Sequence, residues 1–274
     1  MPVISTNTAA NSAVRYLNMN ANQESSALSK LSSGSRITQA SDDAAGLAIS
    51  TRISSDVTTL QQAATNASQA TSILQTADGG ASNISDILAR MKSLASESAS
   101  GTVTDSSRTY INSEFTQLTS EIDSIASGTR YSGQSLLDGT SAFASGVSVL
   151  VGSSGSDTVT ITISSLKAST LGLSTLGVDT QANATAALTT LDTAIDTVSA
   201  ARATIGAQES RFNFSADSIS TQTENLQSAN SAIKDVDVAS EEATLSSAEV
   251  KTQAAVSAET AANQMPQFLL KLLG

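Results

Sequence analysis

The chain has 274 residues, and 25 acidic against 14 basic residues give it a net charge of −11. Histidine, cysteine and tryptophan are absent, which excludes disulfides, thiolate chemistry and the commonest general base and metal ligand. The acidic balance argues against nucleic acid as a partner, and no apolar run is long enough to span a bilayer, which argues against a membrane. We therefore expect no enzyme, no catalytic, cofactor or metal site, and no cleavable secretory signal at the N-terminus.

An apolar seam with alternating four- and three-residue steps marks a first helix near the N-terminus. Its members are Ala10, Val14, Leu17, Ala21, Glu24, Leu28 and Leu31. This spacing keeps a narrow stripe on one side of a helix and requires a partner helix. Because the stripe is rich in alanine, the helix alone is marginal in water, and we expect it to become ordered when other chains surround it.

A long second helix is predicted from residue 44 to about residue 99, a rod of roughly 80 Å. Ser41, Asp42 and Asp43 precede it and offer side chains that cap helix N–H groups. Gly79 and Gly80 lie inside it and together cost about 2 kcal/mol relative to alanines. The apolar spacing keeps its phase across the two glycines, so a continuous rod is favoured over two collinear helices.

The period of the apolar residues changes twice in the second half of the chain. A third helix carries Ile111, Phe115, Leu118, Ile122 and Ile125, and Gly128 closes it. Alternating Val and Ile residues then predict a β-hairpin at about residues 143–165. Helical spacing returns near Thr180 and continues to a hinge at Asp235 and Asp237.

A terminal seam follows this hinge. Its members are Leu245, Ala248, Thr252, Ala255, Glu259 and Ala262, followed by Phe268, Leu269, Leu270, Leu272 and Leu273. The whole order predicts a mainly α fold, a long antiparallel coiled-coil-like helical bundle with a small central β-hairpin. The chain folds back so that the N- and C-terminal helices pair. Residues 1–40 carry three basic residues and one acidic residue, and residues 235–274 carry two and six, so opposite net charges of +2 and −4 favour that pairing.

Segments at both ends of the chain resemble the signatures of bacterial flagellin. ALSKLSSGSRI at residues 27–37 and ASDDAAGLAI at residues 40–49 resemble the N-terminal signature. IGAQ at residues 205–208, RFN at residues 211–213 and ANQMPQ at residues 262–267 resemble the C-terminal region in the same order. Taken together, the matches cover essentially the whole chain.

The resemblance implies a structural subunit that polymerises with itself into the extracellular flagellar filament for motility. Family members leave the cell through the flagellar type III export channel and assemble under a filament cap. The resemblance implies an inner-tube domain of residues 1–40 and 235–274, a rod domain of residues 41–234 and no sizeable outer domain. A flagellar export chaperone, the cap and hook–filament junction proteins are the further partners that it implies.

Two sets of residues are candidates for contacts with partners. The assembly interface is expected at Val14, Leu17, Leu28, Leu31, Leu245, Phe268, Leu269, Leu270, Leu272 and Leu273. Arg90, Leu94 and Glu114 match a strip that in many flagellins contacts the innate-immune flagellin receptor and is also buried in filament contacts. Ser93 departs from the acidic residue usual there, so receptor binding and ordinary rod packing both stay open.

Two other functions remain as alternatives at this stage. A hook–filament junction protein shares the terminal helices of flagellin. A soluble carboxylate-dependent enzyme or binding module on a helical scaffold belongs to a different class and requires a pocket with convergent acidic side chains.

Overall fold

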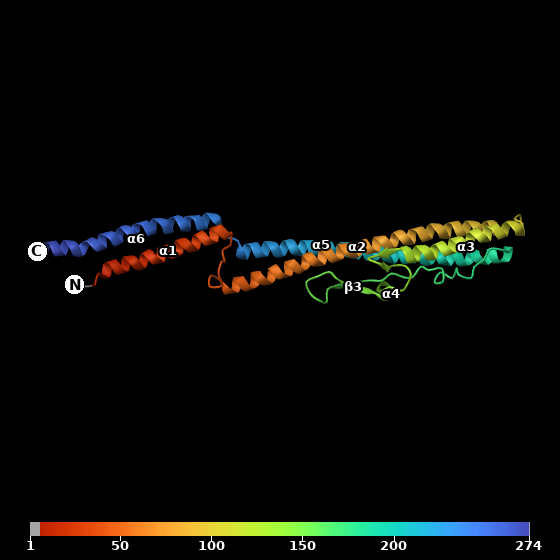
Figure 1. Cartoon of the computed structure of the whole chain (residues 1–274), viewed down its shortest axis with the longest axis horizontal. Helices are drawn as coiled ribbons and strands as arrows, with labels where there is room; N and C mark the ends of the chain where they lie inside the picture. The colour runs from red at the N-terminus through yellow and green to blue at the C-terminus, as the bar shows by residue number, and fades with distance from the viewer. Residues whose placement is uncertain (1–5, 274) are drawn as a thin grey trace. The chain divides into compact units, whose positions relative to one another are not determined.

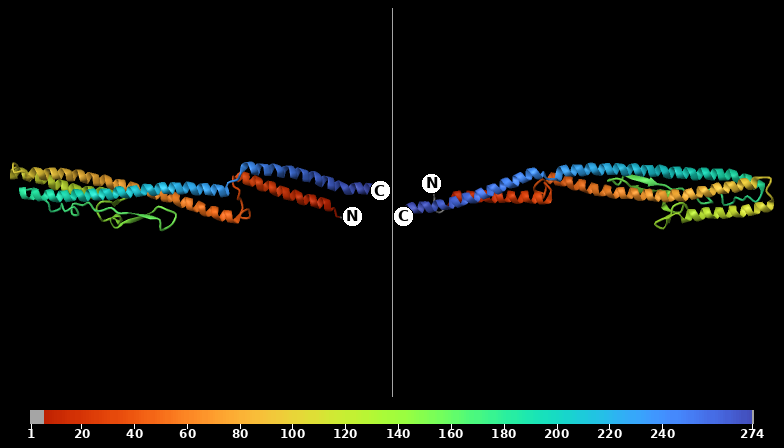
Figure 2. Two further views of the ribbon diagram at one scale, coloured as in Figure 1. Left: turned by 180° about the vertical axis from the view of Figure 1, so that it is seen from behind. Right: turned by 90° about the horizontal axis from the view of Figure 1, so that it is seen from above.

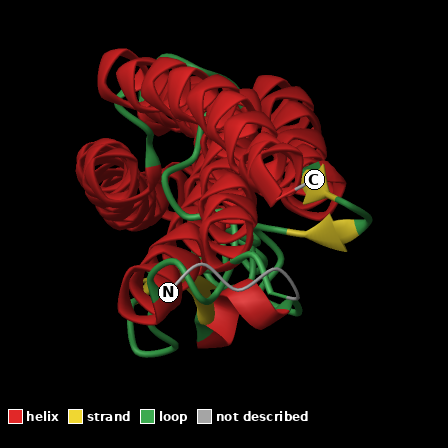
Figure 3. Cartoon of the chain, turned by 90° about the vertical axis from the view of Figure 1, so that its left-hand side faces the viewer, coloured by secondary structure: helices red, strands yellow, loops and turns green. Residues whose placement is uncertain are grey.

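The computed structural model describes the backbone of residues 6–273 and the side chains of residues 6–265. In that part of the chain, six helices and two antiparallel pairs of short strands follow one another, and most of the residues are helical (Figure 3). The chain divides into two compact units, residues 1–55 with 225–274 and residues 56–224. The expected mainly helical fold is confirmed.

The first unit pairs the terminal helices α1 (Thr8–Ser33) and α6 (Val238–Leu273), which lie side by side and antiparallel (Figure 1). Asn7 caps α1, because its side-chain oxygen accepts a hydrogen bond from the third amide of the helix at 3.1 Å. Gly34 ends α1 in the left-handed conformation with φ at 68°, which glycine adopts at little cost. At the start of α6, the Asp237 carboxylate accepts from the second and third amides of the helix. The predicted pairing of the two ends is confirmed.

The seam of α1 differs from the predicted one at every second position. The buried or half-buried seam positions are Ala10, Ala13, Leu17, Asn20, Glu24, Ala27 and Leu31. Val14, Ala21 and Leu28, which were expected in the seam, are exposed beside it. The side chains at Ala13 and Ala27 are smaller than those at Val14 and Leu28, and they let the two backbones approach with Cα atoms within 8 Å. A spacing of 3.5 residues fits either set of positions, so packing decided between them.

The two connections of the first unit pair with each other. Ser35 and Asp235 form an antiparallel bridge, and the amide of Arg36 donates to the carbonyl of Lys234 at 2.7 Å. The Ser35 hydroxyl is buried and donates to the same Lys234 carbonyl. The predicted hinge is therefore a three-residue break, residues 235–237, that is held by the connection between α1 and α2.

The second unit packs the greater part of α2 (Ala44–Ala99) and α5 (Gln181–Lys234) with α3 (Asp105–Gly128), and the three helices run alongside one another in Figure 2. Helix α2 continues without interruption through Gly79 and Gly80, so the prediction of a continuous rod is confirmed. Its buried residues keep three- and four-residue steps: Leu60, Ala63, Ala67, Ala70, Leu74, Ala77, Ala81, Ile84, Leu88, Met91 and Ala95. This stripe is the pattern of a coiled-coil seam.

Two hairpins connect α3 to α5. The larger one, the predicted β-hairpin, pairs β3 (Val147–Leu150) with β4 (Thr158–Ile161), with Val147 opposite Ile161. The smaller one pairs β1 (Arg130–Tyr131) with β2 (Gln134–Ser135), and this pairing was not predicted. The region expected to open the larger hairpin is instead a short helix, α4 (Ala142–Ser145). These elements are too short for periodicity to show them.

Side-chain amides fasten the larger hairpin to the helices on either side of it. The buried Gln208 amide of α5 accepts from the backbone N–H of Thr162 at 3.1 Å and donates to the carbonyl of Thr162 at 2.9 Å. From α2, the Asn66 amide donates to the carbonyl of Leu150 at 3.2 Å. Both outer edges of this small sheet thus have a partner, which an isolated two-stranded hairpin lacks.

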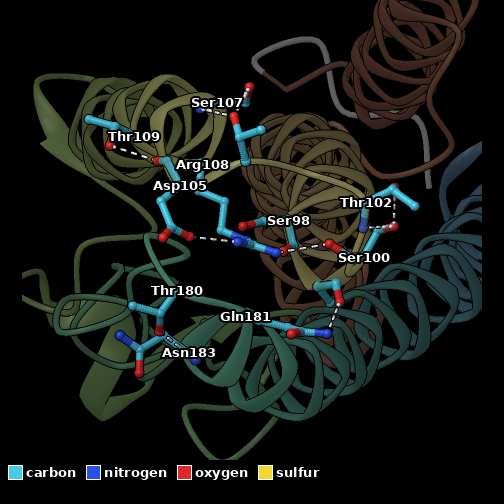
Figure 4. Close-up of polar contacts among 12 residues, drawn as sticks. Ser98, Ser100, Thr102, Asp105, Ser107, Arg108, Thr109, Thr180, Gln181 and Asn183 are labelled. Atoms are coloured by element: carbon cyan, nitrogen blue, oxygen red, sulfur yellow. Dashed lines mark hydrogen bonds and ion pairs between the residues drawn. The ribbon is translucent and has the colours of Figure 1, made fainter.

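Arg108 organises the turn between α2 and α3 (Figure 4). Its side chain is buried, and it donates to the carbonyls of Ser98 and Ser100 at 2.9 Å each and to the Asp105 carboxylate at 2.8 Å. Nearby, the Gln181 amide donates to the carbonyl of Ala99 at 3.0 Å. The last two carbonyls of α2, those of Ser98 and Ala99, have no partner within the helix and are therefore satisfied by side chains.

Candidate assembly surface

The seam between α1 and α6 is built from alanine. Its buried apolar residues are Ala10, Ala27, Ala248, Ala255 and Ala262. Leu17, Leu31 and Leu245 are half-buried at its margins. A buried alanine methyl contributes about 0.8 kcal/mol, so this seam contributes far less per turn than the Leu, Ile and Phe core of the second unit. The pair of terminal helices therefore gains little stability from its own core.

Polar contacts cross the same seam and fix its register. The ammonium of Lys30 lies 3.9 Å from the carboxylate of Glu241, and the Thr252 hydroxyl donates to Glu24 at 3.4 Å. The Asn7 amide donates to the carbonyl of Ala262 at 2.8 Å. These contacts select one alignment of the helices, whereas an ion pair at the surface adds at most about 1 kcal/mol of stability.

Large apolar side chains are exposed mainly in the first unit. Nine of the eleven exposed large apolar residues among the described ones belong to it: Val14, Tyr16, Met19, Leu28, Ile49, Val238, Val250, Val256 and Met265. The other two are Tyr110 and Phe214 in the second unit. The unit with the weakest core thus carries most of the uncovered apolar surface, and such surface on a soluble chain marks an interaction site.

A groove of about 400 Å³ follows one side of the α1/α6 pair. It is lined by Ala13, Tyr16 and Asn20 from α1 and by Lys251, Ala254, Ala255 and Ala258 from α6. Small side chains form its floor, and the Tyr16 ring stands at its edge with the Arg15 guanidinium 5.7 Å from the ring centre. The groove has the size and apolar floor to accept side chains of another helix.

The expected interface residues occupy three different environments. Val14 is 38% exposed and Leu28 is 58% exposed, so both are free to contact another molecule. Leu17, Leu31 and Leu245 are half-buried in the seam. The remaining members, Phe268, Leu269, Leu270, Leu272 and Leu273, belong to α6 but lie outside the residues whose side chains are described. Tyr16, Met19, Val250 and Val256 were not expected in this surface, because they fall outside the predicted seams.

Arg90 and Glu114 form a surface ion pair, and Leu94 lies beneath the surface. The Arg90 guanidinium donates twice to one Glu114 oxygen, at 2.9 and 2.6 Å. Leu94 is only 2% exposed, so it does not belong to an accessible strip in the isolated chain. Lys92 in the same helix pairs with Asp192 of α5 at 2.5 Å. This part of α2 is bound to α3 on one side and to α5 on the other.

A group of charged residues lies midway along the second unit. The Arg202 guanidinium donates to both oxygens of Asp78, at 2.8 and 3.2 Å, and this carboxylate raises the pKa of Arg202. Burial, together with the charge of Asp78, raises the pKa of Glu209 above its ordinary value. One Glu209 oxygen is buried without a hydrogen-bond partner. The structure places both Arg202 and Glu209 at half-buried sites.

Other kinds of site find no support in the described part of the chain. Within it, His, Cys, Asp and Glu side chains nowhere gather in groups of three that could hold a metal ion. Of the helices described, none combines the length and the apolar character needed to cross a bilayer. The exposed apolar surface of α1 and α6 is thus the strongest candidate for function.

Proteins similar to this chain match it over almost its whole length. Residues 4–142 match the family model of the bacterial flagellin N-terminal helical region, and residues 188–273 match that of the C-terminal helical region. The flagellin of Halalkalibacterium halodurans is 34% identical over 273 residues, which cover 99% of this chain and 99% of that protein. The flagellar filament 30.7 kDa core protein of Treponema maltophilum is 34% identical over 285 aligned positions, again covering 99% of both chains.

A solved structure is also similar. The crystal structure of Bacillus cereus flagellin aligns with a TM-score of 0.52 and 32% identity, and the alignment covers 61% of this chain and 94% of that one.

Proposed function

Since the chain belongs to the bacterial flagellin family and is a structural subunit of the flagellar filament, we propose that α1 and α6 carry the surface through which its copies polymerise. The observation that carries this proposal is the contrast within the first unit. Its buried apolar residues are alanines and Ile37, whereas its exposed ones include Val14, Tyr16 and Leu28. Contact with neighbouring copies covers that surface and supplies the burial that the pair of helices lacks.

If copies polymerise through α1 and α6, the two domains take the roles expected from the sequence. Residues 1–40 and 235–274 form the inner tube, and residues 41–234 form the rod around it. The region between α3 and α5 supports the absence of a sizeable outer domain, because it holds only β1–β4 and α4. Export through the type III channel, a chaperone that covers the apolar C-terminal residues, and binding to the cap and to junction proteins complete this proposal. The hook–filament junction alternative is not favoured, since the similar proteins that span the whole chain are filament proteins.

We assign the strip around Arg90 and Glu114 to packing within the rod. The support is that Leu94 is buried and that Arg90 is bound by Glu114. The competing hypothesis is that the innate-immune flagellin receptor recognises this strip. A receptor reporter assay with monomeric protein and its Arg90→Ala variant separates the two, because Arg90 is exposed, whereas truncation of the buried Leu94 disturbs the rod itself. Equally weak signals from both proteins support packing, and a strong signal that Arg90→Ala abolishes supports receptor recognition.

Replacement of an exposed apolar residue tests the polymerisation surface. Leu28→Glu places a charge where the proposal requires apolar contact, whereas Ser29→Glu adds the same charge at the next residue, which is polar and exposed. We expect Ser29→Glu to form filaments after nucleation and Leu28→Glu to form none, with unchanged circular dichroism of both monomers. Normal filaments from Leu28→Glu in negative-stain micrographs contradict the assignment.

Deletion of residues 265–274 tests the contribution of the C-terminal end of α6. We expect the truncated chain to remain monomeric under conditions in which the full chain polymerises. Normal filaments from the truncated chain contradict a role for these residues in assembly.

A further inference from the structure

The α1/α6 pair has two flanks, one on each side of its seam. Each flank is defined by its place next to the seam residues. The first flank consists of the residues that directly follow Ala13, Asn20, Ala27, Glu241, Ala248, Ala255 and Ala262. The second flank consists of the residues that directly precede Ala10, Leu17, Glu24, Leu31, Leu245, Thr252 and Glu259. Each residue turns a helix by about 100°, so these two sets lie on opposite sides of the seam. Because the helices are antiparallel, the corresponding sets of α1 and α6 lie on the same side.

The first flank is acidic and apolar. Its members are Val14, Ala21, Leu28, Glu242, Glu249, Val256 and Asn263, all of them exposed. We call this set the acidic flank. It contains Glu242 and Glu249 and no lysine or arginine, so its net charge is −2. Val14, Leu28 and Val256 provide its apolar contact surface.

The second flank is basic and bears the groove. Its members are Ala9, Tyr16, Gln23, Lys30, Thr244, Lys251 and Ala258. We call this set the basic flank. It contains Lys30 and Lys251 and no acidic residue, so its own net charge is +2. Lys30 is half-buried and paired with Glu241 of the seam, so Lys251 is the free positive charge of this set. The Arg15 guanidinium over the Tyr16 ring adds a further positive charge at the edge of the groove.

We infer that the acidic flank of one copy docks on the basic flank of the next. The inference rests on the proposed function, and it names the two faces that meet. In this arrangement Glu249 and Glu242 approach the positive charges of Lys251 and Arg15. The apolar residues of the acidic flank lie against the alanine floor of the groove beside Tyr16. Charge complementarity selects the partner face and apolar burial supplies the affinity.

Pairing of unlike flanks also determines the kind of assembly. Two acidic flanks, or two basic flanks, place like charges opposite each other, which disfavours a two-fold symmetric dimer. A contact between two different faces leaves one free face at each end, so copies add until a ring or helix forms. The opposite charges of the flanks thus favour a tube over a closed pair.

Charge reversal with rescue tests this pairing. Glu242→Lys with Glu249→Lys makes both flanks positive, and Arg15→Glu with Lys251→Glu removes the positive balance of the basic flank. We expect each double variant to raise the critical concentration for polymerisation roughly tenfold, because exposed ion pairs are individually weak. The quadruple variant exchanges the signs of the flanks and is expected to return to within about threefold of the unmodified chain.

A matched control carries the same change in net charge elsewhere. Glu97→Lys with Glu121→Lys alters two exposed residues of the second unit, and we expect polymerisation at the original concentration. An equimolar mixture of the two double flank variants is also expected to copolymerise, since each offers the charge that the other lacks. High salt is expected to reduce the differences among these variants.

The outcomes separate this inference from the proposed function. Normal assembly by both double variants, or a quadruple variant worse than either, overturns flank pairing. If Leu28→Glu still blocks assembly in that case, polymerisation through α1 and α6 stands without flank pairing. If the double variants fail, the quadruple variant polymerises and the control behaves normally, the pairing is supported.

Discussion

Gly79 and Gly80 are adjacent in α2, yet a methyl group at each position meets a different environment. A Cβ atom at Gly79 has no atom within 4 Å beyond its own helix. A Cβ atom at Gly80 lies 2.8 Å from Cδ1 of Leu137 and 2.9 Å from Cγ2 of Thr129, and also clashes with the Thr129 hydroxyl. Leu137 is fully buried. Gly80 therefore permits the close approach of the segment after α3, whereas Gly79 has no packing role.

The difference predicts effects of opposite sign for the same substitution. Gly79→Ala gains helix propensity and stabilises the folded chain by about 1 kcal/mol. Gly80→Ala has the same gain, but overpacking costs about 1–3 kcal/mol. The contacts at Gly80 are with side-chain atoms of the fully buried Leu137 and the half-buried Thr129, so we take the middle of that range, a cost of about 2 kcal/mol. We expect a net destabilisation of about 1 kcal/mol, and hence a difference of about 2 kcal/mol between the variants.

Urea unfolding of the monomeric full-length chain, followed by far-ultraviolet circular dichroism, measures both effects. The unmodified chain is the reference, and a midpoint shift at constant slope reports the change in stability. Equal stabilisation by both alanines contradicts the close packing at Gly80. Destabilisation by Gly79→Ala contradicts the open environment of that position.

Two further substitutions test buried polar groups of the second unit. Arg108→Met removes the side-chain donor of the Ser98 carbonyl and one of the two donors of the Ser100 carbonyl, which keeps the Val103 amide, and we expect a loss of about 2 kcal/mol in urea unfolding; a loss below about 0.5 kcal/mol refutes the role of this side chain. Glu209→Gln removes a carboxyl whose pKa is raised by burial and by Asp78, so ionised Glu209 weakens the fold as the pH rises through that pKa. We expect Glu209→Gln to stabilise the chain at pH 7 and the gain to shrink as the pH falls below the ordinary carboxyl range; a gain equal at both pH values contradicts this explanation.

The long helices were predictable because their spacing persists over many turns. The seam of α2 repeats from Leu60 to Ala95, and capping side chains such as Thr104 and Asp237 mark where helices begin. Because these signals are local and repeated, they can be recognised in the sequence even when the partner helix is unknown. The same reasoning predicted that the chain folds back and pairs its ends.

The exact face of α1 was not predictable from the sequence. Val14 and Leu28 are more apolar than Ala13 and Ala27, so a hydrophobicity criterion placed them in the seam. The structure instead buries the alanines, because small residues allow the backbones of α1 and α6 to approach closely. The larger side chains remain outside, where a further copy can cover them.

Roles that depend on contacts between residues far apart in the sequence were also not predictable. Gln208 was part of a family signature, but its pairing with Thr162 exists only when the hairpin folds onto α5. Arg108 stood alone in the sequence, and its function depends on three groups brought together at the turn. The elements β1, β2 and α4 have two to four residues each, which is too short for a period to be visible.

Hydrogen exchange of α1 and α6, compared between monomer and filament, tests whether these helices depend on neighbouring copies for their stability. The alanine seam predicts that the amides of both helices exchange rapidly in the dilute monomer, while those of α2, α3 and α5 in the second unit are protected. On polymerisation the amides of α1 and α6 are expected to slow by several orders of magnitude as neighbouring copies cover Val14, Leu28 and Val256. Slow exchange of the terminal helices in the dilute monomer, unchanged in the filament, contradicts the account.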